Sequence, residues 1–521
     1  MVTERSSAVV LWLALAGMSS AARAAAPVDA RIFAGKGPGE TASVLVVMRE
    51  QADLSAVATI ADPEERRRFV FEALRAQAEI SQCPLVERLR RSGTRHRAFY
   101  LVNMLEVKAD RSLADELARR DDVSFLAANL PASLARHPRV EEAERLAPSS
   151  ASAVEPNIDK IGAPVVWARG FTGQGIVVGV ADTGFTWDHP ALKPHYRGFD
   201  GVSVSHDYNW HDAVHEAGSE NRCGSDSPSP CDDEDHAPGH GTAMSGFLVG
   251  DDEGDSKIGV APGARLIGCR NMDQGDGTPA RYTECFEFLL APTDLAGQNP
   301  RPDLGAHVIN NSWGCFVSEG CTDPNILKTV VENTRAAGVF VVASAGNLGE
   351  RGCASVIDPP AIYEAAISVG ATTLGDEILS YSSRGPVTVD GSGRVKPDLV
   401  APGGGRTAVW PSGYGSIGGT SAAAPHVAGT VALVWSAAPW LAGNVPETEE
   451  LLRSTAVHLT SDQSCGGIPG SSIPNPVFGW GRVDVAAAVS VALPSGPPPP
   501  PAPRIPVSRR RTGSRTIPPR N

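Results

Sequence analysis

The chain has 521 residues, of which 42% are hydrophobic and 20% charged, so it can bury a large core and is neither a peptide nor a wholly disordered protein. Its 54 glycines and 42 prolines exceed the usual share and predict many tight turns and ordered loops. With 46 basic against 59 acidic residues, the formal net charge of −13 repels phosphate backbones, and nucleic acid is not expected as a partner.

The first segment, residues 1–26, has the order of a secretory signal peptide. Arg5 precedes an apolar run at residues 9–16, and small residues follow. That run is too short to cross a bilayer, and no later stretch reaches about 18 uninterrupted apolar residues. A buried N-terminal helix is the alternative, but such a helix would carry polar residues on one face. We therefore expect an exported chain, extracellular or periplasmic, without a membrane span.

Residues 27–150 predict a small α/β domain. The elements expected in chain order are a strand at 43–47, a long charged helix at 63–91, a strand at 98–107, a helix at 112–120 and a strand at 123–127. A polar connector with Ala, Ser and Pro follows at about 141–155. Its composition favours a linker or a cleavage zone.

The character of the chain changes over residues 151–493. Short β-branched runs alternate with helical stretches, which is typical of a buried, mostly parallel sheet with helices on both faces. The clearest strands are residues 176–180, 308–309, 339–342 and 367–369. The fold class expected for this part is therefore α/β.

The last segment, residues 494–521, is rich in Pro and Arg, lacks acids and has almost no apolar residues. It cannot form a packed core and is predicted to be disordered. A basic arm for an anionic cell surface and a processed tail are two interpretations, but a solvated extension without a specific partner is favoured.

Nine cysteines are present, and eight of them lie after residue 200. In an exported protein this even number favours disulfides, and no two are spaced as CxxC, which weakens a zinc site. The easiest closures are Cys223 with Cys231 and Cys315 with Cys321. Cys269 with Cys285 and Cys353 with Cys465 would complete four bridges, although spacing alone does not fix the connectivity.

Three segments place a reactive side chain where a strand or turn meets a glycine-rich break. Asp182 ends an apolar strand, His240 lies in Gly-His-Gly-Thr, and Ser421 heads an apolar helix. Because strand carboxyl ends share one edge of an open α/β sheet, the three side chains can converge. A serine hydroxyl needs a base, and the base works best when a carboxylate fixes its tautomer.

A fourth residue, Asn347, follows the strand at 339–342. Its amide and the N–H of Ser421 are candidate donors to the oxyanion that forms when a carbonyl is attacked. Taken singly, an Asp at a strand end, a His among glycines or a Ser at a helix start is usually structural. Together, and in this order, they favour nucleophilic catalysis.

On these residues the sequence resembles the subtilisin-like serine peptidases, or subtilases, whose chain order Asp, His, Ser it shares. The resemblance covers about residues 156–489. Within the family it is most similar to bacillopeptidase F type enzymes, on the strength of residues 206–210 (HDYNW), 268–272 (GCRNM), 310–315 (NNSWGC) and 358–363 (DPPAIY). The N-terminal strand and helix pattern resembles the family's inhibitory, chaperone-like propeptide.

The resemblance implies a three-layer sandwich and a secreted serine endopeptidase that is made as a self-processed zymogen. Asp182 would orient His240, His240 would act as base and then acid, and Ser421 would attack. The segment Ser312-Trp313-Gly314 would form one wall of the substrate cleft.

The family further implies protein or peptide substrates, no cofactor for the chemistry, the chain's own propeptide as intramolecular inhibitor, and a monomer. By the family alignment, Asp358 would lie near the floor of the pocket for the residue before the scissile bond and favour Lys or Arg there. A turn cap before Pro359 is an equally good interpretation of Asp358.

Two departures from the family concern metals, whose sites stay unknown. Ala191 stands where many relatives carry an aspartate that binds calcium, which puts that site in doubt. The run Asp232-Asp233-Glu234-Asp235, within an insertion at 198–235, is a candidate site for a structural calcium ion. It lacks the ligand spacing of a calcium loop, however, and a solvated charge run is favoured. In a third departure, Ala422 replaces the methionine that often follows the nucleophile.

Two other functions are weighed against hydrolysis. A binding protein that keeps the fold without turnover would lack a triad residue or Asn347, and none is missing. A transpeptidase would need a cleft that shields the acyl enzyme from water, and analysis of the products would distinguish joined from cut peptides.

Overall fold

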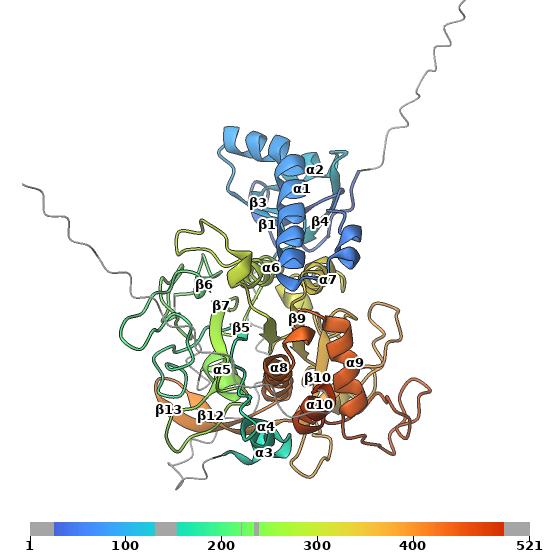
Figure 1. Ribbon diagram of the computed structural model, residues 1–521. Coiled ribbons are helices and arrows are strands. Elements are labelled where there is room, and N and C mark those ends of the chain that lie inside the picture. Colours follow the sequence, from blue (N-terminus) through green and yellow to red (C-terminus); the bar gives the residue numbers. More distant parts are fainter. Residues whose placement is uncertain (1–24, 131–153, 220, 234–238, 494–521) are drawn as a thin grey trace, which may run out of the picture.

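The structure is a computed structural model that describes residues 25–130, 154–219, 221–233 and 239–493. Most of the expected signal peptide (residues 1–24), most of the connector, the end of the acidic run and the C-terminal segment lie outside the described residues. A smaller N-terminal unit, residues 25–130, sits on the helices α6 and α7 of the larger unit (Figure 1). We describe the two units in turn.

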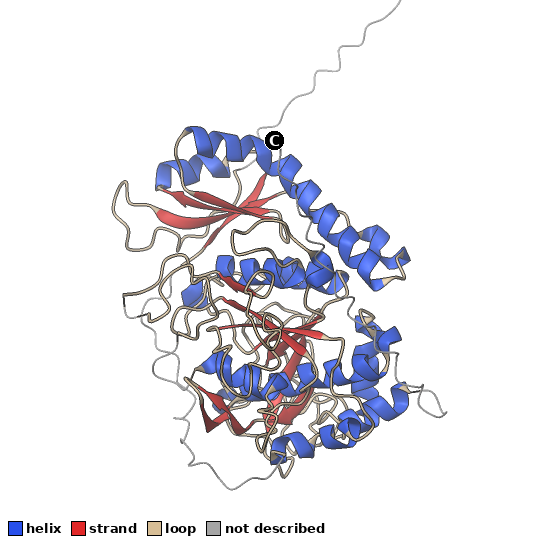
Figure 2. Cartoon of the chain, turned by 60° about the vertical axis from the view of Figure 1, so that its left-hand side comes forward, coloured by secondary structure: helices blue, strands red, loops and turns tan. Residues whose placement is uncertain are grey.

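The N-terminal unit is an antiparallel sheet with helices packed on it (Figure 2). Its sheet has the strand order β2-β3-β1-β4. Asp62 caps the long helix by accepting a hydrogen bond from the Glu65 N–H at 2.8 Å, and Pro63 occupies the first turn. The elements are β1 Ala42–Met48, η1 Ser55–Thr59, α1 Pro63–Arg91, β2 His96–Phe99, β3 Met104–Ala109, α2 Arg111–Ala118 and β4 Val123–Ala128.

The single strand expected at residues 98–107 is wrong. The chain forms the antiparallel pair β2 and β3 instead, with a turn at residues 100–103. The turn itself carries two buried apolar residues, Leu101 and Val102, before the buried Asn103, so it resembles the strands on either side. The main-chain N–H of Leu101 finds its acceptor in the larger unit, on Glu287 at 2.7 Å.

The larger unit is built on a seven-stranded sheet in which every described pairing is parallel, as the sequence predicts. Its strands are buried and rich in β-branched residues because helices cover both faces. In sheet order they are β11 Leu399–Pro402, β10 Ile367–Thr372, β9 Phe340–Ser344, β8 Val308–Asn311, β5 Val177–Asp182, β7 Arg265–Arg270 and β6 Trp210–Asp212.

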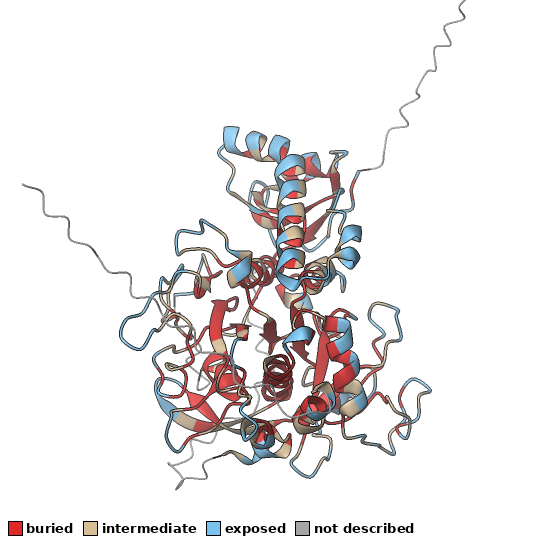
Figure 3. Ribbon diagram, viewed as in Figure 1, coloured by how far each residue is buried: buried red, intermediate tan, exposed pale blue. Residues whose placement is uncertain are grey.

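Two helical layers sandwich this sheet. One layer holds α5 His240–Val249 and α8 Thr420–Ala437, and the opposite layer holds α6 Pro279–Leu290 and α7 Lys328–Ala336. Figure 3 shows α8 at the centre as an almost wholly buried helix. The remaining elements are α3 Pro156–Lys160, α4 Ala163–Trp167, η2 Pro302–Leu304, η3 Val317–Glu319, η4 Gly349–Arg351, β12 Gly404–Val409, β13 Gly413–Gly418, η5 Pro439–Leu441, α9 Val445–Thr455 and α10 Val485–Ala492.

A continuous apolar cluster joins the two units. It contains Val70 and Leu74 of α1 together with Phe286 and Leu289 of α6. Their burial removes apolar surface from water on both units at once, which contributes about 25 cal/mol per Å². The N-terminal unit is therefore docked by a hydrophobic contact and not only by surface charges.

The four disulfides suggested by the cysteine spacing are all present: Cys223–Cys231, Cys269–Cys285, Cys315–Cys321 and Cys353–Cys465. Cys83 on α1 is free and exposed. Among the described residues, no helix is both long and apolar enough to cross a bilayer. The disulfides agree with an oxidising compartment.

Candidate active site

The predicted site residues gather at one edge of the sheet. Asp182 is the last residue of β5, Ser312 directly follows β8, and Asn347 lies shortly after β9. Because these strands are parallel, their carboxyl ends share an edge. His240 and Ser421 lie in the first turns of α5 and α8, which pack on the same face of the sheet.

Close packing of α5 against its neighbours places His240 near Asp182. A Cβ at Gly241 would lie 1.9 Å from the main-chain oxygen of Gly184 and 3.1 Å from Asp182 Cβ, so only glycine fits there. Farther along, Met244 and Phe247 of α5 form a buried cluster with Ala422 of α8. The alanine that departs from the family pattern is thus part of the contact between the two helices.

Asp182 and His240 form a direct hydrogen bond. His240 Nδ1 lies 2.7 Å from Asp182 Oδ1, and the aspartate is completely buried, whereas the imidazole is partly exposed. Since an ionised carboxylate only accepts, the ring proton sits on Nδ1, and Nε2 of the neutral imidazole carries the lone pair. The N–H of Thr183 also donates to Asp182 Oδ1 at 2.8 Å. This pair has the geometry of a base with its orienting acid.

Ser421 lies in a reciprocal pair of hydrogen bonds with Ser312. Ser421 Oγ donates to the main-chain oxygen of Ser312 at 3.1 Å, and Ser312 Oγ donates to the main-chain oxygen of Ser421 at 2.8 Å. In this state the Ser421 hydroxyl proton therefore points to Ser312. Bonds between a nucleophile and its base are often long or misaligned before substrate binds.

Asn347 is held in one orientation by Thr420, the residue before Ser421. Its Oδ1 accepts from the Thr420 N–H at 3.0 Å and from Thr420 Oγ1 at 2.9 Å. The network therefore assigns the oxygen to the Thr420 side and leaves Nδ2 as a donor. The Ser421 N–H belongs to the first turn of α8 and has no acceptor within the helix. Two donors are thus available at the nucleophile.

The structure gives the three residues of the predicted cleft wall different environments. Trp313 is only 6% exposed; its indole N–H donates to the main-chain oxygen of Ala181 at 3.0 Å and its ring stacks on Tyr282 with centroids 3.8 Å apart. The Trp313 side chain therefore packs inside the protein, beneath the carboxyl end of β5. Gly314 is partly exposed, and a Cβ there would lie 2.8 Å from Asp358 Cβ.

Asp358 is therefore adjacent to the wall segment at Gly314. Burial raises the pKa of Asp358 to about 7, and Arg351 opposes this shift. No described backbone N–H donates to its carboxylate, so a turn cap before Pro359 lacks the hydrogen bond that would define it. Cys315 N–H donates to the main-chain oxygen of Pro359 at 2.7 Å and ties the two segments together.

The acidic run is not a solvated charge run where it is described. Asp232 and Asp233 are 1% and 0% exposed. Their carboxylates accept hydrogen bonds from Thr183, Thr242, Asn221 and Arg270, so they do not present a set of calcium ligands. Glu234 and Asp235 lie outside the described residues.

The second calcium question concerns Ala191. Its methyl group lies in a buried apolar cluster with Ile258 and Ala408, and it supplies no ligand. Among the described residues, no group of three or more His, Cys, Asp or Glu side chains is arranged to hold a metal ion.

Sequence reasoning did not identify Asp232 and Thr183 as parts of this site. Thr183 was visible only as the residue after Asp182, and Asp232 only as one acid in a run. Both side chains link the segment after β5 to the start of α5, as described below. Nothing in the local sequence identifies these two residues, because their role depends on the insertion folding back onto the end of β5.

Comparison with known proteins defines the class. The family model of the subtilase family matches residues 173–481, which include Asp182, His240, Asn347 and Ser421. The chain therefore belongs to the subtilase family, whose fold agrees with the parallel sheet and its helical layers.

Three individual proteins show how similar this chain is to known subtilases. The chain is 33% identical to bacillopeptidase F of Bacillus subtilis (strain 168) over 467 residues, which are 87% of this chain and 30% of that protein. It is 29% identical to subtilisin E of the same strain over 328 residues, 63% of this chain and 68% of that protein. It is 32% identical to subtilisin DY of Bacillus licheniformis over 263 residues, 50% of this chain and 77% of that protein. The chain thus spans less than a third of the length of bacillopeptidase F.

Proposed function

We propose that this chain is a secreted serine endopeptidase that hydrolyses peptide bonds in proteins through an acyl enzyme. The observation that carries the proposal is the 2.7 Å hydrogen bond between buried Asp182 and His240, formed where α8 presents Ser421 at the same edge of the sheet. Membership of the subtilase family supports the same assignment.

In this proposal Ser421 attacks the substrate carbonyl and His240 Nε2 takes its proton. On substrate binding, the Ser421 hydroxyl is proposed to turn from Ser312 towards the imidazole. Asp182 keeps the ring in the required tautomer and stabilises the imidazolium. Asn347 Nδ2 and the Ser421 N–H donate to the oxyanion, His240 returns its proton to the leaving amine, and water then releases the acyl enzyme.

The positive end of α8 contributes to the same step. The helix has 18 residues and begins at Thr420, so the peptide dipoles at its positive end, the Ser421 N–H among them, face the developing negative charge. Because these dipoles are fixed by packing in a buried helix, they need no reorganisation during the reaction. No cofactor is required for this chemistry.

The substrate is proposed to lie along Ser312–Gly314 as an added strand, with Asp358 beneath the side chain that precedes the scissile bond. Gly314 supports this placement because its lack of a side chain lets Asp358 approach the wall. An ionised Asp358 would favour Lys or Arg in this pocket. A neutral Asp358 would not.

This gives a pH-dependent preference as a prediction. Because the pKa of Asp358 is raised to about 7, its carboxyl is neutral below that pH and charged above it. For peptides with Lys or Arg before the scissile bond, kcat/KM is expected to rise through pH 7 more steeply than for matched Leu peptides, since the titration of His240 affects both alike. Asp358→Asn is expected to lower the Lys and Arg values about 10- to 100-fold and to leave the Leu value nearly unchanged. An unchanged Lys and Arg preference in Asp358→Asn would remove Asp358 from the pocket.

The N-terminal unit, with the proposed boundaries 27–150, is assigned as a propeptide that templates folding and blocks the cleft until it is cut. Three contacts with the helical layer support this: Glu287 accepts hydrogen bonds from the N–H groups of Tyr100 and Leu101, Asn129 Oδ1 accepts from the Ala280 N–H at 3.1 Å, and Asn333 Nδ2 donates to the Leu101 oxygen at 2.7 Å. At its last described residue, the Leu130 N–H donates to the Glu319 oxygen at 3.2 Å. The chain leaves this unit beside the Cys315–Cys321 loop that follows the wall segment.

Glu287→Ala is expected to weaken inhibition by the propeptide. The substitution leaves two part-buried N–H groups without an acceptor, at about 1 kcal/mol each, which corresponds to roughly 10- to 10²-fold in the inhibition constant. The measurement compares the activity of processed enzyme before and after the cleaved propeptide is removed by gel filtration, at several protein concentrations. Glu332→Ala on α7 is the control, because its side chain is exposed and, among the described residues, forms an ion pair with Lys328 alone. Equal inhibition in both variants would contradict the role of Glu287.

Export and self-processing complete the proposal. The four disulfides support an oxidising compartment, and the segment 1–26 has the pattern of a signal peptide. The peptidase domain is taken as residues 151–493, followed by the Pro- and Arg-rich tail at 494–521. The mature enzyme is expected to act as a monomer on protein or peptide substrates.

An organophosphonate probe tests the assignment as an enzyme. Wild-type protein is expected to gain one label, which peptide mass spectrometry maps to Ser421, and Ser421→Ala is expected to stay unlabelled. Analysis of peptide products is expected to show cut and not joined chains. A folded wild-type protein that takes no label and cuts no peptide would overturn the proposed function.

A further inference from the structure

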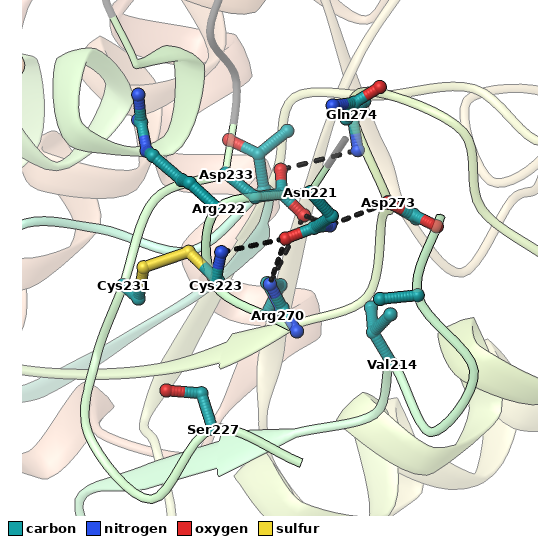
Figure 4. A network of polar contacts seen from close by, with 12 residues as sticks. Val214, Asn221, Arg222, Cys223, Ser227, Cys231, Asp233, Arg270, Asp273 and Gln274 are labelled. Carbon is teal, nitrogen blue, oxygen red and sulfur yellow. Dashed lines mark hydrogen bonds and ion pairs between the residues drawn. A yellow bond between two sulfur atoms is a disulfide. The ribbon is translucent and has the colours of Figure 1, made fainter. Parts of the chain in front are cut away.

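The inserted loop beside the active site is anchored in the core by a buried network of charges (Figure 4). At its centre is Arg270, the last residue of β7, which is completely buried. Its guanidinium donates to both oxygens of Asp212, at 2.8 and 2.6 Å, and lies 3.3 Å from Asp233 Oδ2. Asn221 links the start of the loop to this network, because its Nδ2 donates to Asp233 Oδ2 at 2.8 Å and its Oδ1 accepts from Arg270. Both ends of the loop are thus fixed.

The disulfide Cys223–Cys231 closes the loop between these two anchors. Its second half runs directly along the segment that follows Asp182. The Asp233 N–H donates to the main-chain oxygen of Thr183 at 3.2 Å, and a Cβ at Gly184 would lie 1.8 Å from the main-chain oxygen of Cys231. Gly184 also has φ of +98°, so a side chain there is excluded twice. The insertion is therefore in backbone contact with the strand end that carries the proposed acid.

Asp232 lies between Cys231 and Asp233, whose main chains contact the segment after Asp182. Its carboxylate is directed to the active site. It is 1% exposed. Its Oδ1 accepts from Thr183 Oγ1 at 2.9 Å, and its Oδ2 accepts from the Thr242 N–H at 2.8 Å and from Thr242 Oγ1 at 2.6 Å. Thr183 Oγ1 in turn accepts from the Gly241 N–H at 3.0 Å. One carboxylate thus holds Thr183, which follows Asp182, and Thr242, which lies two residues after His240.

These contacts replace a missing helix cap. Gly239 occupies the N-cap position of α5 and has no side chain to satisfy the free N–H groups of the first turn. Asp232 accepts the N–H of Thr242, the third residue of the helix, as a capping side chain normally does, and its charge suits the positive end of the helix. A Cβ at Gly239 would lie 2.7 Å from Asp232 Oδ2, so the glycine makes room for this remote cap.

We propose that Asp232 is a positioning residue for the proposed peptidase reaction: through Thr183 and Thr242 it holds Asp182 and His240 in their reacting alignment from a disulfide-closed insertion. The inference rests on the proposed function and adds a determinant of kcat to it. Misplacing a reacting group by about 1 Å costs as much as 10²-fold in rate, so a residue that fixes two of the three proposed catalytic groups affects turnover without touching substrate.

The test uses the full chain, expressed and allowed to process, with all rates given per active site titrated with the phosphonate. Asp232→Asn keeps the shape of the side chain but replaces one of its two acceptor oxygens with an NH2 group. The remaining oxygen can accept hydrogen bonds from Thr183 or from Thr242, but not from both. The substitution is expected to lower kcat about 10- to 100-fold while KM changes less than about threefold. Asp226→Asn is the matched control with kcat expected to stay at the wild-type value, because Asp226 lies in the same disulfide loop with a side chain that is 63% exposed.

Coupling between residues separates positioning from a general loss of stability. Thr183→Val removes the hydroxyl that Asp232 holds and is expected to lower kcat, whereas Thr183→Ser is expected to restore it. In the double variant Asp232→Asn with Thr183→Val, the losses in kcat are expected to be less than the product of the single losses, because both act through one hydrogen bond.

Three results would overturn the inference, and each differs from failure of the proposed function. These are a wild-type kcat per titrated site in Asp232→Asn, whether or not the number of active sites falls, a Thr183→Val variant with a wild-type kcat, and a multiplicative effect of the two substitutions. If instead the wild-type protein has no turnover and takes no label, the proposed function has failed. In that case the inference about Asp232 falls with it.

Discussion

Replacing Ser421 with alanine is expected to lower kcat by about 10⁶-fold and to leave the precursor uncut. The alanine removes the nucleophile, and without it His240 has no hydroxyl to activate. What remains is catalysis by the oxyanion donors and by binding alone, which amounts to about 10³–10⁴-fold over water. The measurement is the initial rate on a chromogenic peptide, together with the mass of the protein recovered after expression.

The matched control is Ser436→Ala on the same helix. The Ser436 hydroxyl is buried and has no hydrogen-bond partner among the described residues, so its removal is expected to leave both activity and processing intact. Activity in Ser421→Ala within a factor of ten of the wild-type value would exclude Ser421 as the nucleophile. A folded Ser421→Ala precursor that still loses its N-terminal unit in purified form would exclude self-processing.

The second large effect is expected at Asn347. Asn347→Ala is expected to lower kcat about 10²- to 10³-fold, or about 2.7–4 kcal/mol, with KM nearly unchanged. The donor acts on charge that develops only after attack, so its loss is felt in the transition state and not in substrate binding. Steady-state kinetics on the same peptide measures both constants.

A second substitution at Asn347 separates the donor from the structural role of the side chain. Asn347→Asp keeps an oxygen for the two hydrogen bonds from Thr420, but it places an acceptor where the donor nitrogen was. Its loss in kcat is expected to be at least as large as that of Asn347→Ala. Near-normal turnover in Asn347→Asp would mean that the alanine variant fails through Thr420, and the oxyanion role would be wrong.

The residues of the candidate site that were predictable are those whose position follows from strand ends. Asp182 ends an apolar strand, Asn347 follows another, and His240 and Ser421 begin helices in glycine-rich breaks. In a parallel α/β sheet these places share an edge, so local pattern and chain order together were enough. The parallel sheet itself was predicted from the alternation of short β-branched runs with helical stretches.

The role of Asp232 was not predictable, because it depends on the insertion packing back against the end of β5. That packing leaves no pattern in the local sequence. Four consecutive acids look like a solvated run, but the buried Arg270 and the Asn221 side chain, both distant in the sequence, contact Asp233 inside the core. The pairing of Arg270 with Asp212 and Asp233 is a tertiary property. Charge patterning along the chain therefore gave the wrong environment for this segment.

The prediction of a single strand at residues 98–107, which missed the turn at residues 100–103, failed for a related reason. An apolar run normally predicts one strand, and turn residues normally mark its end. Here the turn is apolar because Leu101 and Val102 pack into the cluster shared with α6, and Glu287 of that helix accepts the turn's N–H groups. The interface between the units, and not the local sequence, determines where β2 ends.

A crystal structure of the mature enzyme with a peptidyl phosphonate bound to Ser421 would test the proposed catalytic site directly. We expect a covalent bond from Ser421 Oγ to phosphorus, with His240 Nε2 within hydrogen-bond distance of that oxygen and a phosphonyl oxygen within about 3 Å of Asn347 Nδ2. His240 Nδ1 should remain bonded to Asp182. An adduct on another residue, or one on Ser421 with the imidazole turned away and the phosphonyl oxygen remote from Asn347, would contradict the proposed site.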